Sequence, residues 1–404
     1  MKARSTGTLR RLRSLLVHQV RSSRFFPTTI PDRLGDDDVL AGGRLDERVI
    51  VYFPDTAESL YQLQPWLPAL EALHQRFPVV VICQDSRTAA AIRRTSRLRV
   101  LTVARYGRLD DLLSRSEVAV VLYVNHSSRN FECLRFTEVV HVYLGHGDSD
   151  KGVSASNQVK AYDYCFVAGE VAVARIAAHV RRFDAALRCL RIGQPQLDGT
   201  GLLPTKPPTA APADPPIRAR VLYAPTWEGA QPSVAYSSLL THGPQLVSSL
   251  IAAGFEVTFR PHPLSGVTSG EYAAADATIR SLVSAAGAPH RVDAAGSLAT
   301  SFQDADLLVT DISAVALNWL PGGRPLVITQ AAGDAKETRS PLTDIVPRLT
   351  VSDLDRCAEI VRAALADRER AARLDTIEQF FEVATDGAAT AAFIAAVQRV
   401  AAEA

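Results

Sequence analysis

Two histidines stand out because each follows a short apolar run and has neighbours that either free or restrict the backbone. His146 lies in the segment GHGDSDKG at residues 145–152, where the glycines let the backbone approach a ligand closely. His262 lies in the segment RPHP at residues 260–263, where two prolines restrict the backbone around it. Near neutral pH a histidine can act as a general base or as a hydrogen-bond donor. For either segment taken alone, an ordinary polar turn with an incidental histidine is the alternative.

Groups that can meet phosphate accompany both histidines. Lys151 follows His146 in the first segment, and Arg260 offers a planar guanidinium that matches phosphate oxygens. Asp148 and Asp150 lie between His146 and Lys151. Two carboxylates would repel a phosphate unless a cation lies between them.

Two further apolar runs end in residues suited to a ligand. Thr226 and Trp227 follow the run 220–224, and Trp227 can stack on a base or a sugar or, equally, fill a core. The run 307–310 ends in Thr310, followed by Asp311 and Ser313 at the start of a predicted helix. The N–H groups at such a helix start attract an anion, whereas a simple N-cap is the more common alternative.

The elements that position these residues follow from recurring Val- and Ile-rich runs, which are typical of buried parallel strands. Predicted strands cover 49–53, 79–83, 99–103, 118–124, 139–144, 164–167, 220–224, 256–260, 307–310 and 325–329. Predicted helices cover 58–77, 170–183, 237–253, 271–286, 313–320, 351–366 and 388–402. This alternation indicates two doubly wound α/β domains, whose ligands bind beyond the carboxyl ends of the strands.

A cluster of five prolines between residues 207 and 216 interrupts the alternation and indicates a linker. The sequence therefore predicts a basic amphipathic segment over 1–35, an N-terminal Rossmann-like domain over 36–200 and a Pro-rich linker over 201–218. A C-terminal Rossmann-like domain follows over 219–385, and a C-terminal helix over 386–404.

Composition excludes several classes of protein. The chain has 404 residues, 47% of them hydrophobic, which is too many for a disordered chain, and its net charge of +1 argues against a general nucleic-acid binder. Five scattered cysteines without a CxxC pair indicate reduced thiols in a cytoplasmic protein. No run is apolar enough to predict a transmembrane helix.

The first thirty residues carry seven basic side chains and no acidic one, with Leu9, Leu12, Leu16 and Val20 at helical spacing. Such a segment can lie on an anionic membrane surface, and a solvated N-terminal helix is the equal alternative.

In their order along the chain, the motifs HGxxxK, IGQPQLD at 192–198, YAPTW at 223–227, RPHP and TDxS at 310–313 resemble those of the CDP-glycerol glycerophosphotransferase family. That family includes the wall teichoic acid primases and polymerases. The resemblance implies a GT-B fold, in which two facing Rossmann-like domains enclose a central cleft. It also implies that the N-terminal domain binds the acceptor and the C-terminal domain binds the nucleotide donor.

The resemblance implies that an acceptor hydroxyl attacks the β-phosphorus of CDP-glycerol and that CMP leaves. His146 corresponds to the family's HG histidine, which the resemblance implies to be a general base or a residue that orients the acceptor. His262 corresponds to the histidine that, with Arg260, binds the donor phosphates and stabilises the leaving CMP. The implied substrate-binding residues are Gly147, Lys151, Thr226, Trp227, Arg260, Thr310, Asp311 and Ser313, with Asp148 and Asp150 as acceptor-side candidates. No metal ligand is predicted. The resemblance leaves open whether Mg²⁺ binds together with the donor phosphates.

The sequence departs from the family pattern in two of these motifs. Asp148 and Asp150 replace the neutral middle of an HGTPLK-like motif, and Ala314 stands where a second serine is common. Two carboxylates near the implied pyrophosphate would repel it unless a cation lies between them or they face an acceptor polyol. Another polyol phosphate donor is therefore compatible with the sequence.

The resemblance further implies a lipid-linked glycan or polymer acceptor and a peripheral location at the inner face of the cell membrane. The alternative enzyme is a nucleotide-sugar glycosyltransferase or epimerase of GT-B fold. The alternative without catalytic activity is a degenerate nucleotide-binding scaffold. The sequence leaves the oligomeric state open, with a homo-oligomer as one option.

Overall fold

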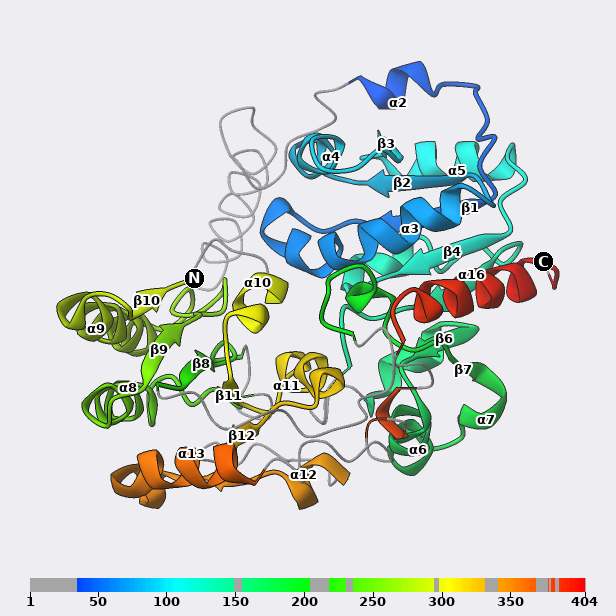
Figure 1. Ribbon diagram of the computed structural model, residues 1–404. Helices are drawn as coiled ribbons and strands as arrows, with labels where there is room; N and C mark the ends of the chain where they lie inside the picture. The colour runs from blue at the N-terminus through cyan, green and yellow to red at the C-terminus, as the bar shows by residue number, and fades with distance from the viewer. Residues whose placement is uncertain are drawn as a thin grey trace, which may run out of the picture. The chain divides into compact units, whose positions relative to one another are not determined.

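The computed structural model (Figure 1) describes residues 35–148, 155–203, 218–229, 235–293, 298–330, 341–367, 377, 379–381 and 385–403. Nearly all of the predicted basic segment 1–35 and most of the predicted linker 201–218 lie outside these residues, as do Asp150 and Lys151.

The described chain divides into two compact units. The first comprises the described residues of Met1–His146, Lys160–Phe166 and Ile394–Ala404, and the second those of Gly147–Val159 and Val167–Phe393. The chain therefore passes from the first unit to the second between the histidine and the second glycine of the GHG segment.

One sheet has seven strands in the order β3-β2-β1-β4-β5-β6-β7, and its neighbouring strands from β3 to β6 pair in parallel. The strands are β1 Val49–Phe53, β2 Val79–Cys83, β3 Arg99–Thr102, β4 Val120–Tyr123, β5 Val140–Tyr143, β6 Tyr164–Val167 and β7 Cys189–Arg191. The order reverses between β1 and β4, which is the switch point where doubly wound sheets bind ligands.

The helices that accompany these strands are short. They are α2 Asp36–Val39, α3 Leu67–His74, α4 Ser86–Arg93, α5 Tyr106–Ser114, α6 Glu170–His179 and α7 Ala185–Arg188. Short 3-10 helices are η1 Ala57–Gln62, η2 Gln64–Trp66, η3 Ser128–Glu132, η5 Asn157–Ala161 and η6 Pro195–Leu197.

The other sheet lies in the second unit and is parallel throughout, in the order β10-β9-β8-β11-β12-β13. Its strands are β8 Arg220–Ala224, β9 Glu256–Phe259, β10 Arg291–Val292, β11 Leu307–Thr310, β12 Leu326–Thr329 and β13 Arg348–Leu349. Here the order reverses between β8 and β11, which makes the exits of these two strands the expected ligand site.

The helices of this unit are α8 Gly243–Ala252, α9 Gly270–Ala286, α10 Leu298–Gln303, α11 Ala314–Trp319, α12 Pro341–Ile345 and α13 Cys357–Ala366, with 3-10 helices η8 Leu320–Gly322 and η9 Val351–Arg356. The last helix, α16 Ala388–Ala401, begins in the second unit and ends in the first.

Both faces of the second sheet are buried, which explains why its strands are apolar throughout. In β8, Val221 and Tyr223 join the core that α8, α9 and α13 cover, whereas Leu222 and Ala224 join the core on the opposite face. Figure 1 shows α8 and α9 together at the edge of the sheet where β9 and β10 lie. Successive strand residues point to opposite faces, so each strand contributes to two cores.

The predicted strands are confirmed to within a few residues, and the predicted helices are shorter at several ends. The predicted helix 58–77 is instead η1, η2 and α3, since Pro65 and Pro68 stand at the starts of two of these elements and lack the N–H that a continuous helix needs. The predicted helix 237–253 begins only at Gly243, which precedes Pro244. The edge strands β7, β10 and β13, of two or three residues each, were not predicted from the sequence.

All five cysteines are buried and free of disulfides, as expected for small core residues. Within the described ranges, no helix is long and apolar enough to cross a membrane.

Candidate active site

The exits of β8 and β11, at the switch point of the second sheet, are joined by Asp311. Its carboxylate accepts hydrogen bonds from the backbone N–H of Thr226 at 2.6 Å and of Ser238 at 3.1 Å, and from the hydroxyl of Thr329. The side chain is 0% exposed, and burial raises the pKa of its carboxyl. Asp311 therefore holds the two strand exits together.

Thr310 and Ser313 are also directed into the protein. The Thr310 hydroxyl donates to the carbonyl of Ala224 at 2.6 Å and lies 3.5 Å from the Ser313 hydroxyl. Both side chains are buried. The structure brings the predicted residues Thr226, Thr310, Asp311 and Ser313 together, with the side chains of Thr310 and Asp311 engaged in fixing the backbone.

Arg260 and His262 follow β9, the next strand in the sheet after β8. The Arg260 Nη1 atom donates to Asp293 Oδ2 at 3.1 Å and to Ser301 Oγ at 2.9 Å. Asp293 directly follows β10, and Ser301 lies on α10. These two contacts fix the direction of the guanidinium beside the carboxyl end of the sheet.

The loop that carries His262 holds its neutral ring in one tautomer. Its Nδ1 atom accepts the backbone N–H of Leu264 at 3.1 Å, so the neutral ring carries its proton on Nε2. The Trp227 ring stacks beside it, with 6.4 Å between ring centroids and 25° between planes. The loops after β8 and β9 thus present a hydrogen-bond donor next to an indole ring, an arrangement suited to a phosphate beside a flat group.

His146 is exposed at the carboxyl end of β5, in the first unit. Gly145 before it has φ +66°, a left-handed conformation that glycine adopts without strain, and its carbonyl accepts a 2.7 Å hydrogen bond from Trp66 Nε1. The Tyr61 ring meets the His146 ring edge-on at 6.2 Å. Trp66 therefore fixes the turn that exposes the imidazole.

The two residues after His146 belong to the second unit and contact different elements there. A Cβ on Gly147 would lie 2.8 Å from the Cβ of Ala314, so glycine is required for this approach to α11. Asp148 Oδ1 accepts a 2.6 Å hydrogen bond from Arg175 Nη1 on α6, whose side chain is 3% exposed. Arg175 is therefore a cation that offsets the Asp148 charge.

Three polar residues at the switch point of the first sheet were not predicted from the sequence: Asp55, Asn125 and His126. Asn125 Nδ2, after β4, donates to Asp55 Oδ2, after β1, at 2.7 Å, which joins the two strand exits as Asp311 does in the second unit. His126 stacks on Tyr143 with ring centroids 4.0 Å apart. Each of these residues lies one or two positions beyond the end of an apolar run, and this position was the signal that the sequence offered.

His126 also lies close enough to His146 to interact with it electrostatically. Burial and, secondarily, the charge of His146 lower the pKa of His126 to about 4. At neutral pH His126 is therefore uncharged and adds no positive charge beside His146.

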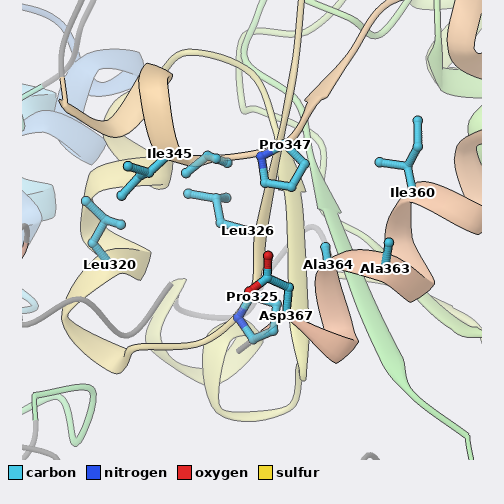
Figure 2. A pocket seen from close by; sticks show the side chains of 10 residues that line it. Leu320, Pro325, Leu326, Ile345, Pro347, Ile360, Ala363, Ala364 and Asp367 are labelled. Carbon is cyan, nitrogen blue, oxygen red and sulfur yellow. The ribbon is translucent and has the colours of Figure 1, made fainter. Parts of the chain in front are cut away.

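Among the described residues, no group of three or more His, Cys, Asp and Glu side chains could hold a metal ion. A pocket of about 230 Å³ in the second unit is lined almost entirely by apolar side chains and by Asp367 (Figure 2). Pro325 and Pro347 in its wall directly precede β12 and β13, so the pocket lies at the amino ends of the strands. It is therefore at the opposite edge of the sheet from His262.

Residues 84–397 match the family model described as CDP-glycerol:poly(glycerophosphate) glycerophosphotransferase. The chain belongs to this family and is a glycerophosphotransferase-family enzyme.

Solved structures show similarity of fold. Two structures of the wall teichoic acid polymerase TagF align with TM-scores of 0.56 and 0.54 at 12% and 14% identity, each over 98% of this chain and 97% of the other. Anabaena Alr3699/HepE, in complex with UDP and glucose, aligns with a TM-score of 0.50 at 11% identity over 89% of this chain and 100% of the other. The predicted GT-B-like fold is thereby confirmed. No curated protein sequence matches the chain.

Proposed function

We propose that this enzyme transfers glycerol phosphate, or a related polyol phosphate, from CDP-glycerol to a hydroxyl of a membrane-linked acceptor and releases CMP. The product would be part of a teichoic-acid-like or capsular surface polymer. The observation that carries the proposal is the fixed state of His262, whose Nδ1 accepts the Leu264 N–H while its ring lies against Trp227.

The reaction forms a bond from the acceptor oxygen to the β-phosphorus and breaks the bond from that phosphorus to the bridging oxygen. The bridging oxygen keeps the electron pair and leaves with CMP. We assign His146 as the base that takes the hydroxyl proton, because it is exposed and its neighbour His126 is uncharged at neutral pH.

Negative charge moves onto the leaving phosphate, and donors that point at it lower the barrier. We assign this role to the Nε2–H of His262 and to the guanidinium of Arg260. Thr226 and Trp227 would contact the donor from the β8 exit, while Gly147 and Ser313 would border it near α11. Thr310 and Asp311 would act indirectly, through the strand exits that they hold. Asp148 remains an acceptor-side candidate; Asp150 and Lys151, which lie outside the described residues, keep their assignments from the sequence.

The variants His146→Asn and His262→Asn test these roles. Each should lower the rate of CMP release from CDP-glycerol, measured with a lipid-linked acceptor, by at least about a hundredfold. A positioned acid or base typically contributes a factor of about this size to the rate. His290→Asn is the matched control, because His290 Nδ1 accepts the Val257 N–H on the amino side of the same sheet. Unchanged turnover in both site variants, with unaltered melting temperatures, would refute the assignment.

We also propose that the enzyme works at the inner membrane face, supported by the seven basic and no acidic side chains of its first thirty residues. Deletion of those residues should abolish sedimentation with anionic vesicles while leaving CMP release with a water-soluble acceptor intact. Equal sedimentation of both proteins would contradict this location.

A further inference from the structure

Glu228, next to Trp227 in the β8 exit loop, is buried although it is acidic. Its Oε2 accepts the backbone N–H of Gly266 at 3.1 Å, and its Oε1 accepts the backbone N–H of Thr268 at 3.2 Å and the Thr268 hydroxyl at 2.9 Å. Glu228 is only 5% exposed. One carboxylate therefore ties the loop after β8 to the loop after β9.

The hydrogen bonds keep this carboxylate charged. Burial acts to raise the pKa of Glu228, but the backbone N–H groups and the Thr268 hydroxyl outweigh it, and the net shift is downward. A hydrogen bond to an ionised group is stronger than one between neutral groups. Glu228 thus holds Gly266 and Thr268 more firmly than a neutral acceptor would.

The loop that Glu228 holds is the one that carries His262. Inside it, the His262 carbonyl accepts the N–H of Ser265 at 2.9 Å, and the His262 ring accepts the N–H of Leu264. Its tip is fixed from the other side as well, because a Cβ on Gly266 would lie 2.6 Å from the Cα of Ala273 on α9. The loop is therefore anchored by Glu228 and by α9, only a few residues beyond the histidine.

The opposite end of the β8 exit is anchored by Asp311, which accepts the Thr226 N–H. The segment from Thr226 to Glu228 is thus tied at one end to β11 and at the other to the loop after β9, with Trp227 between the two ties. This segment links the β11 exit to the His262 loop.

We propose that Glu228 is a positioning residue that fixes the loop after β9 so that His262 keeps its proton on Nε2 and its ring beside Trp227. Its effect on transfer rests on the proposed function of His262, whereas its effect on the histidine ring does not. Glu228 acts through the loop and does not itself contact the reacting phosphate.

Glu228→Gln is the test, because it keeps the size of the side chain but replaces one acceptor oxygen with an NH₂ group that faces a backbone N–H. Glu256→Gln is the matched control, since it makes the same change at the amino end of β9, where Glu256 pairs with Arg291. The ¹⁵N shifts of the His262 ring, assigned with His262→Asn, report which nitrogen carries the proton.

We expect the wild type and Glu256→Gln to show a single Nε2–H tautomer, and Glu228→Gln to show a mixture of both tautomers. The value of kcat for CMP release should fall about tenfold or more in Glu228→Gln, as expected for loss of hydrogen bonds to a charged group. A pure Nε2–H tautomer in a folded Glu228→Gln protein would overturn the proposal, even if its melting temperature is lower.

Thr268→Val gives a second route should Glu228→Gln fail to fold. It removes only the hydroxyl donor, so it should shift the tautomer ratio in the same direction by a smaller amount, and an unchanged ratio would count against the proposal. The ring measurement needs no substrate. If CDP-glycerol is not the donor, CMP release will be missing in the wild type while the tautomer result still decides the role of Glu228.

Discussion

At the scale of single residues, the most consequential feature is that His262 and His146 each have a neighbour that bears on the proton or the charge at the ring. His262 owes its tautomer to the Leu264 N–H, and His146 has the uncharged His126 nearby. Histidine alone titrates near neutral pH, so these contacts decide whether a ring accepts or donates a proton.

The lowered pKa of His126 makes stability depend on pH. Between about pH 6.5 and about pH 4 the unfolded chain binds a proton at this residue that the folded protein rejects. The free energy of unfolding is therefore unaffected by His126 above about pH 6.5, and it falls as the pH falls from about 6.5 toward about 4. Burial also lowers the pKa of His141 and His242, so these residues should further decrease the free energy of unfolding as the pH falls.

Urea unfolding at about pH 7 and about pH 5 checks this, with His126→Asn beside the wild type. The wild type should lose more unfolding free energy on acidification than the variant. Equal losses in the two proteins would show that His126 is not the group responsible.

At the scale of elements, the turn after His146 depends on α6. Arg175 on α6 is buried and donates a hydrogen bond to Asp148, and removing one partner of a buried ion pair is strongly destabilising. The Asp148→Ala substitution should therefore lower the free energy of unfolding by about 3–5 kcal/mol.

Chemical denaturation measures this loss, and Glu170→Ala provides the comparison. Glu170 pairs with Arg191 at 3.0 Å, but both side chains are largely exposed, so that substitution should cost less than about 1 kcal/mol. A similar small cost for both substitutions would mean that Arg175 does not depend on Asp148.

The strands were the elements that sequence could predict best. Buried parallel strands such as β8 need apolar residues on both faces, and such runs are visible in a sequence. The edge strands β7, β10 and β13 have two or three residues each, too few to form a recognisable run. Helix ends were predicted less well, because prolines at 65, 68 and 244 divide or delay the helical segments.

For the candidate site, sequence identified the strand exits but not the partners of the residues there. Arg175 lies 27 positions beyond Asp148, and Asp293 lies 33 positions beyond Arg260, and no local pattern predicts such pairs. Asp55 and Asn125 were missed because their importance depends on the strand order, which places β1 beside β4.

At the scale of the whole molecule, both sheets repeat the same strand order around a switch point, and in both a carboxylate joins the two strand exits there. Asp311 does so in the second unit and Asp55, through Asn125, in the first. The family match over residues 84–397 includes residues of both units.

The central claim, use of CDP-glycerol as donor, is tested most directly by a screen of nucleotide donors. Purified full-length enzyme is incubated with CDP-glycerol, CDP-ribitol and UDP-sugars, each with and without a lipid-linked glycan acceptor, and the released nucleotide is quantified. We expect acceptor-dependent release of CMP from CDP-glycerol or from CDP-ribitol, and loss of this release in His262→Asn. Release of UDP from a sugar donor, with no CMP from either CDP-polyol, would contradict it.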